Sequence, residues 1–272
     1  SFLSRDKKHP LLLVTSSEAA PIWIPSFEAF SLSLGNSDFT CCQRNHNFTD
    51  SRGKRVECDK PRVVAIVRPL LEKKIAHFRL TEQYEDARWL KCTTSFIMRA
   101  LPFKEHIEIS SNGDEIDRLK RELFWNEDEE SSEWIDENGH SLLSYAASRG
   151  DIACVTAILD RLSHVSKKQR QAVLDHQISA SGIRLLKFGA SVTALHLSMA
   201  FGNVSCVEAL LKAGADPLLC EKNGVDGLMM CAFMSADVDC IHAWFKHLPK
   251  WDVNRKNTVV GGIAVGCTLC NG

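Results

Sequence analysis

The stretch Thr193–Pro217, TALHLSMAFGNVSCVEALLKAGADP, carries the clearest structural pattern in the chain. Its apolar residues recur at helical spacing on both sides of Gly202. The Leu210-Leu211 pair then leads into Gly214-Ala215-Asp216. The stretch therefore predicts two short helices joined by a glycine turn, and a repeat of this unit elsewhere would predict a stacked structure.

The same pattern occurs in two other places. Ser141–Leu159 has leucine, glycine, valine and a final leucine at the same offsets as Thr193–Leu211. A third copy starts at Asp226, 33 residues after Thr193, with one residue added at the turn between its helices. The chain thus holds three copies of one helix–turn–helix unit.

The period of 33, the Thr-x-Leu-His opening at Thr193 and the Gly-Ala-Asp after the second helix resemble the ankyrin repeat. The family pattern is Thr-Pro-Leu-His-x-Ala, and no copy here is complete. Leu142, Ala194 and Gly227 replace the proline, and the histidine survives only as His196. The resemblance implies a mostly α fold, an ankyrin-repeat α-solenoid of helix–turn–helix units with β-turn fingers, and an irregular or α+β N-terminal region.

These patterns divide the chain into three parts. Residues 1–110 lack the period and stay unassigned, residues 111–133 predict a capping helix and an acidic linker, and residues 134–272 predict the repeat array. The capping helix is indicated by Ile116, Leu119 and Leu123, which share one helical face. Within the array we place repeats near 136–160, 188–217 and 221–250, a partial repeat at 252–272 and an insertion near 161–187.

The array departs from the family pattern at two places. Ser141 and Thr193 lie 52 positions apart, 19 more than the period, so we expect an elongated finger or an inserted helix. Ser166 is a candidate N-cap for such a helix, whose apolar face would be Val173, Leu174 and Ile178. A fourth unit registers poorly from either Thr258 or Gly262 and stops about where its first helix would end. We therefore expect a truncated chain or an atypical cap.

The basic cluster of Lys167, Lys168 and Arg170 lies inside the insertion. We interpret it as a solvated helix face, with a nuclear-import or partner contact as the alternative.

Residues 60–90 predict three elements. The apolar run at 63–67 fits a short buried strand, and the segment from Pro69 to Phe78 fits a helix with proline in its first turn. Thr81 would cap another helix that continues to Leu90.

Composition excludes several classes of protein. The net charge of −1 gives no reason to expect a nucleic-acid partner, and no apolar run approaches the ~18–20 residues of a membrane helix. Eleven cysteines at irregular spacing read as reduced thiols. We therefore expect no membrane insertion and a cytoplasmic protein, with the nucleus as the alternative location.

Few residues suggest chemistry. Cys41, Cys42, His46 and Cys58 are metal-ligand types, but adjacent cysteines suit a tetrahedral ion poorly. The Cys267-x-x-Cys270 pair lacks a partner pair. His196 has a structural interpretation, a bond with Thr193 that ties adjacent turns, which we prefer over a catalytic one. No phosphate loop or nucleophile motif occurs in the sequence, so we expect no cofactor, no metal and no enzyme activity.

In an ankyrin array, partners would contact the finger tips and the two residues before each interhelix turn. Those pairs are Ser148-Arg149, Ala200-Phe201 and Phe233-Met234. The finger positions include Glu137, Asn138, His140, Val192, Lys222 and Asn223. Our hypothesis is an apolar stripe of Phe201, Phe233 and Met234, with Arg149 at one edge, that binds a partner peptide or helix. The alternative is that the insertion or residues 1–110 bury these side chains.

The resemblance favours a protein–protein interaction module, a scaffold or adapter that binds another protein through the concave face and finger tips. One alternative is the targeting or regulatory region of a larger enzyme or channel whose catalytic or pore part lies outside this chain. Another makes residues 1–110 a small metal-binding or catalytic domain.

Overall fold

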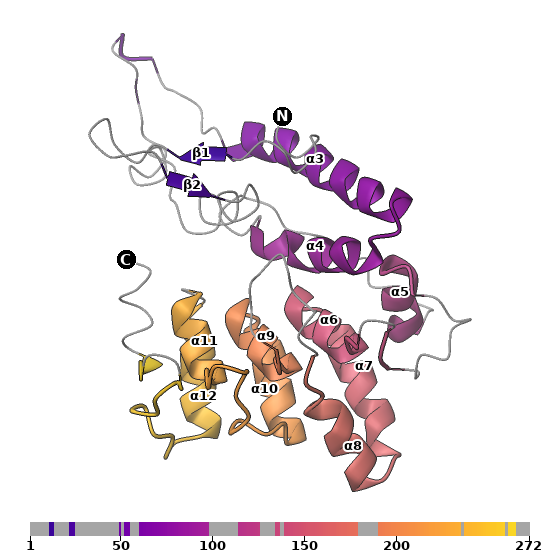
Figure 1. The fold of residues 1–272 in the computed structure, drawn as a ribbon, viewed down its shortest axis with the longest axis vertical. Coiled ribbons are helices and arrows are strands. Elements are labelled where there is room, and N and C mark those ends of the chain that lie inside the picture. The colour runs from indigo at the N-terminus through magenta and orange to yellow at the C-terminus, as the bar shows by residue number, and fades with distance from the viewer. Residues whose placement is uncertain are drawn as a thin grey trace. The chain divides into compact units, whose positions relative to one another are not determined.

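A computed structural model describes residues 11–13, 22–24, 49, 52–54, 60–97, 114–125, 134–136, 139–178, 190–234, 237–258 and 261–264 (Figure 1). The chain forms two compact units, Ser1–His106 and Ile107–Gly272. Each unit is described by itself.

The first unit contains one small sheet and one helical hairpin. Strand β1, Leu11–Leu13, pairs antiparallel with β2, Ile22–Ile24. Helix α3, Lys60–Leu80, packs against α4, Tyr84–Ile97.

Two sequence predictions for this unit are wrong. The run at 63–67 is no strand, because α3 is continuous from Lys60 and holds Pro69 in its interior. A short apolar run fits a buried strand and a buried helix equally well, so periodicity could not separate them. Thr81 does not cap α4. Its hydroxyl donates to the carbonyl oxygens of His77 and Phe78, at 2.9 and 3.2 Å, and so ends α3.

The second unit is built from three helix pairs. They are α6 (Leu142–Arg149) with α7 (Ile152–Ser163), α9 (Ala194–Ala200) with α10 (Val204–Ala213), and α11 (Gly227–Phe233) with α12 (Val238–His247). The first helices contact one another in the order α6, α9, α11, and the second helices in the order α7, α10, α12 (Figure 1). Helix α5, Glu115–Glu122, packs on α7. The prediction of a mostly helical fold is confirmed.

The three copies begin where the sequence places them. Ser141, Thr193 and Asp226 are the N-caps of α6, α9 and α11. Each side chain accepts a hydrogen bond from the backbone N–H three residues later, at 3.1, 3.4 and 2.9 Å respectively. Such a bond satisfies a donor that the first turn of a helix otherwise leaves unpaired.

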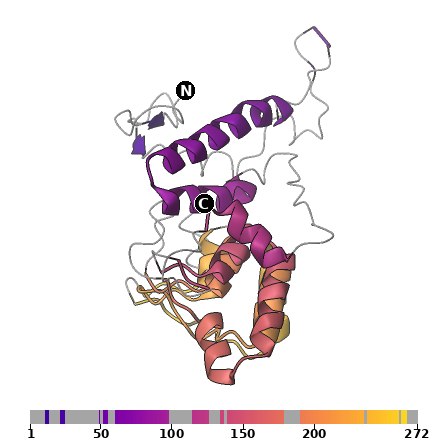
Figure 2. The same cartoon turned by 90° about the vertical axis from the view of Figure 1, so that its right-hand side faces the viewer.

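The segments before the N-caps of α6 and α11 make tight turns, and the described connecting segments project to one side of the helices in Figure 2. The N–H of Asp136 donates to His140 O at 2.9 Å, and that of Glu221 donates to Val225 O at 3.0 Å. The N–H of Asn257 also donates to Gly262 O at 2.9 Å, and Ala264 is helical. The register of a fourth unit stays a prediction.

The insertion contains the predicted helix. Helix α8, Lys167–Leu174, is capped by Ser166 through a reciprocal pair of bonds with Gln169. Ile178 lies beyond the helix and forms an antiparallel bridge with Val192. The insertion is thus an added helix followed by a strand-like contact.

Candidate functional site

His196 is buried inside the second unit, where it bonds to the N-cap of its own helix. Its Nδ1 accepts a hydrogen bond from the N–H of Thr193 at 3.2 Å and lies 2.8 Å from the Thr193 hydroxyl. Its Nε2 makes no hydrogen bond within the described part of the chain. Because Nδ1 accepts, Nε2 must carry the proton of the neutral ring.

Burial lowers the pKa of His196 to about 4, and it outweighs the opposing effect of the Leu219 and Val225 backbone. A histidine that is neutral, enclosed and bonded through Nδ1 to the residue that caps its own helix is a structural residue and a poor general acid or base. The predicted bond between His196 and Thr193 is confirmed.

The proposed apolar stripe is not exposed at Phe201, which is only 1% exposed. Phe201 is the C-cap of α9, and α9 is the central first helix, with neighbours on both sides. A residue at the end of such a helix is enclosed even where the family pattern predicts a surface position. The prediction that Phe201 forms a contact surface is therefore wrong.

His140 and Val192 are also buried, so they cannot be finger tips. Each directly precedes an N-cap and is held by its backbone: His140 O accepts from Asp136 N, and Val192 O accepts from Ile178 N at 2.9 Å. The His140 ring also packs edge-on against Tyr145, with centroids 5.9 Å apart. The residues directly before the N-caps of α6 and α9 are therefore enclosed, whereas Lys222 and Asn223, in the turn before α11, are exposed.

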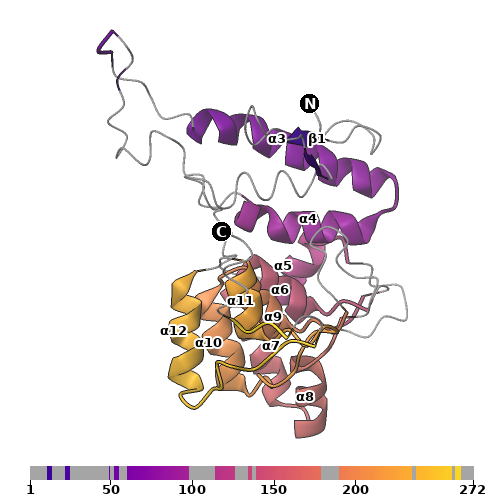
Figure 3. The same cartoon turned by 60° about the vertical axis from the view of Figure 1, so that its left-hand side comes forward.

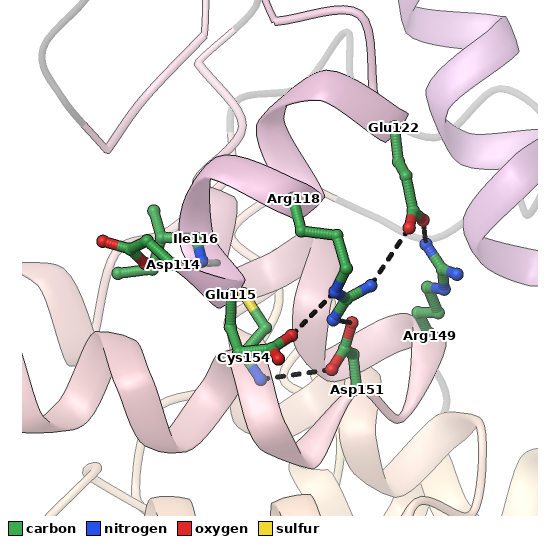
Figure 4. Close-up of polar contacts among 8 residues, drawn as sticks. All are labelled: Asp114, Glu115, Ile116, Arg118, Glu122, Arg149, Asp151 and Cys154. Carbon is green, nitrogen blue, oxygen red and sulfur yellow. Dashed lines mark hydrogen bonds and ion pairs between the residues drawn. The ribbon is translucent and has the colours of Figure 1, made fainter. Parts of the chain in front are cut away.

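Arg149 is the fourth buried candidate, at 8% exposure. Its guanidinium pairs with the Glu122 carboxylate of α5 (Figure 4). Burial alone would raise the pKa of Glu122, but the bonds from Arg149 and Arg118 lower it below its usual value. Arg149 thus fastens α5 to the first helix pair and does not edge a partner surface.

Arg118 stands at the centre of this ionic cluster (Figure 4). It lies on α5 and bonds to Glu115 at 2.7 Å, Glu122 at 3.1 Å and Asp151 at 2.6 Å. The Arg118 and Asp151 side chains are only 7% and 1% exposed. Burial opposes the charge of Arg118, yet its bonds to Asp151 and Glu115 raise its pKa above the ordinary value. A buried pair of this kind is strongly destabilising when one partner is removed.

Asp151 has a second role. Its other oxygen accepts from the N–H of Cys154 at 3.1 Å, so Asp151 is also the N-cap of α7. Asn203 occupies the equivalent position before α10 but makes no cap bond. Its amide donates instead to Ala147 O at 2.7 Å and Ser148 O at 3.0 Å, at the end of α6.

Sequence reasoning missed these connecting residues. Asp151 and Asn203 both follow an interhelix glycine, which signals an N-cap. Nothing in the sequence indicates that one pairs with Arg118, 33 positions away, and that the other bonds to the preceding helix pair. Such contacts depend on how neighbouring pairs pack.

Four of the ten predicted partner-binding residues are at least partly exposed, and all four lie in the third helix pair or in the turn before it. Lys222 and Asn223 are exposed in the turn before α11, Phe233 is 48% exposed at its end, and Met234 is partly exposed. Glu137 and Asn138 lie outside the described residues.

The described part of the chain offers little for catalysis. It contains no group of three or more His, Cys, Asp or Glu side chains that could hold a metal ion. Cys154 and Cys206 are buried; burial raises the pKa of the Cys154 thiol and raises that of Cys206 to about 12, so neither is a ready nucleophile. The residues Cys41, Cys42, His46, Cys58, Cys267 and Cys270 lie outside the described ranges. No described helix is both long and apolar enough to cross a membrane.

Comparison with known proteins supports the interpretation of the second unit. The family model described as Ankyrin repeat matches residues 185–222, which include α9 and α10. The predicted resemblance is therefore confirmed. No curated protein matches the chain.

Proposed function

Because this chain is an ankyrin-repeat protein, with the repeat at residues 185–222, we propose that it is a protein-interaction module that works as a scaffold or adapter. Ankyrin repeats suggest protein partners in general. The confirmed repeat, flanked by two helix pairs with the same N-cap register, is the observation that carries the proposal. The three pairs would form one α-solenoid, with the turns before α6, α9 and α11 as its β-turn fingers.

The partner surface would run along α11. Lys222 and Asn223 precede this helix and Phe233 ends it, so a seven-residue helix separates the polar and apolar groups by roughly 10 Å. Exposed aromatic side chains beside polar groups are typical of interface cores and rims. Met234, which is flexible and apolar, would adapt to the partner.

The other candidates have different parts in this proposal. Arg149, Phe201, His140 and Val192 would hold the array together, since all four are buried. Glu137 and Asn138 remain candidate contacts by their position in the first turn.

We also propose that the module is not itself an enzyme and that it acts in the cytoplasm, with the nucleus as the alternative. These proposals rest on the repeat, which is typical of non-catalytic modules, and on the cysteine pattern of the sequence.

The test compares two exposed apolar positions. Phe233→Ser should remove partners captured by the full chain, while Leu218→Ser, at a residue 62% exposed after α10, should retain them. Both variants should keep the helical circular-dichroism signal. Capture that is equal in both variants would place the partner surface elsewhere.

A further inference from the structure

Three lysines that form no described hydrogen bond or ion pair gather around the inserted helix. Lys167 and Lys168 are the first two residues of α8, and Lys212 lies in the last turn of α10. All three side chains are exposed. We call these residues the lysine cluster.

The position of α8 is fixed by its bonds to the end of α10. Arg170 donates to Ala213 O and Gln171 to Gly214 O, each at 3.0 Å, and Asp175 accepts from Asp216 N at 2.9 Å. Lys167 lies one helical turn before Arg170 and Gln171, on the same face of α8. Because Ala213 directly follows Lys212, these bonds bring lysines about 45 positions apart in sequence into one region. Figure 3 shows α8 at the same end of the array as the C-terminal end of α10.

The lysines of the cluster divide into two kinds. Lys212 lies in the last turn of α10, where the helix dipole favours a cation, so it is explained by the fold alone. Lys167 and Lys168 lie in the first turn of α8, where the dipole disfavours cations and no acidic side chain is present. They are also close in sequence to Arg170, which carries the same charge. Local stability therefore does not explain them, and residues that break a local rule are expected at functional sites.

We propose that the lysine cluster binds an acidic segment of a partner protein. The available cations are lysines, which are point charges, while the neighbouring arginines are engaged: Arg170 with Ala213 O and Arg161 with Asp114. Three lysines match a short run of carboxylates. An anionic membrane surface usually needs four to eight cations, and a nucleic acid about six to ten phosphate contacts. This surface is separate from the strip along α11 and does not depend on it.

The test measures binding of the full chain to a fluorescein-labelled peptide of alternating Asp and Glu, about 12 residues long, by anisotropy. Wild type should bind it with an affinity that falls as sodium chloride is raised. The triple variant Lys167→Glu, Lys168→Glu, Lys212→Glu should bind at least tenfold more weakly. The variant Lys167→Glu, Lys168→Glu should also bind more weakly, yet unfold at a higher temperature, because glutamates suit the first turn of α8.

The control reverses three other exposed lysines, Lys73, Lys250 and Lys256, and has the same net charge as the triple variant. It should bind the peptide within twofold of wild type. An equal loss in the control would overturn the proposal, as would no peptide binding by wild type. The proposal would also be overturned if binding of a single-stranded oligonucleotide or a phosphatidylserine vesicle depended on the lysine cluster while binding of the peptide did not. Circular dichroism verifies that each variant is folded.

Discussion

The two ends of the helical array are held by different forces. At the N-terminal end, α5 joins the first helix pair through buried charges, with Arg118 between Asp151, Glu115 and Glu122. At the C-terminal end, the buried contacts of the third pair are mainly apolar, and its ion pair to the second pair, Lys246 with Glu208 at 2.7 Å, is exposed. Trp244 is fully buried there and meets Trp251 edge to face, with centroids 5.0 Å apart.

This difference shows how one repeat pattern can accommodate unlike neighbours. Asp151, Asn203 and Asp237 are the residues before the second helices, and each uses its side chain differently. Asp151 caps α7 and also pairs with an arginine of α5, Asn203 bonds to carbonyls of α6, and Asp237 caps α12. The ends should therefore respond differently to mutation and to pH.

The largest effect is expected at the charged end. Arg118→Ala would leave the buried Asp151 carboxylate without its partner, and we expect a loss of about 3–5 kcal/mol in the free energy of unfolding, measured in urea. The control is Arg68→Ala, which breaks an exposed pair with Glu72 and should cost less than about 1 kcal/mol. Equal losses would mean that the buried cluster contributes no more to the free energy of unfolding than an exposed ion pair does.

A smaller effect is expected at the apolar end. A Cβ on Gly227 would lie 2.9 Å from Trp244 Cζ3 and 3.4 Å from Met199 Cγ. Gly227→Ala should therefore destabilise the fold by about 1–3 kcal/mol, although alanine is the better helix former. Adding Trp244→Phe should recover part of this loss. If Gly227→Ala stabilises the protein, the packing at this end is looser than described.

Asn203 tests the contact between the first two pairs. Asn203→Ala should lower the free energy of unfolding by about 1–2 kcal/mol. The substitution removes both donated bonds, so the carbonyls of Ala147 and Ser148 lose this donor. Asn203→Asp is the sharper variant, since an aspartate can cap α10 but cannot donate. A loss with Asn203→Asp comparable to that of alanine supports the inter-pair bonds, whereas full stability would show that Asn203 acts as a cap.

Acid should weaken the array in two windows. The folded pKa of His196, about 4 against 6.5 when unfolded, means that only the unfolded chain takes up the proton between these values. Stability should fall by about 1 kcal/mol between pH 7 and pH 5.5. Glu122 has a lowered folded pKa, so its contribution is present above the unfolded value of 4.5 and is lost at lower pH. His196→Gln should abolish the first window, while His242→Gln, at an exposed histidine, should not.

The sequence was sufficient for the features that repeat. Ser141, Thr193 and Asp226 start their helices as predicted because a polar cap before an apolar period is local information. The burial of Phe201 and Arg149 depends on what lies beside the ends of α9 and α6, which no local pattern records. The same reason explains α3, where tertiary context decided between strand and helix for an apolar run.

Native-state hydrogen exchange of wild type and Arg118→Ala tests most directly whether each helix pair depends mainly on its neighbours, as a stacked array requires. The prediction is that amides of α5, α6 and α7 lose protection in the variant, while those of α11 and α12 exchange as in wild type. A uniform loss of protection from α5 to α12 would contradict the account, because it would mean that the array opens as a single unit.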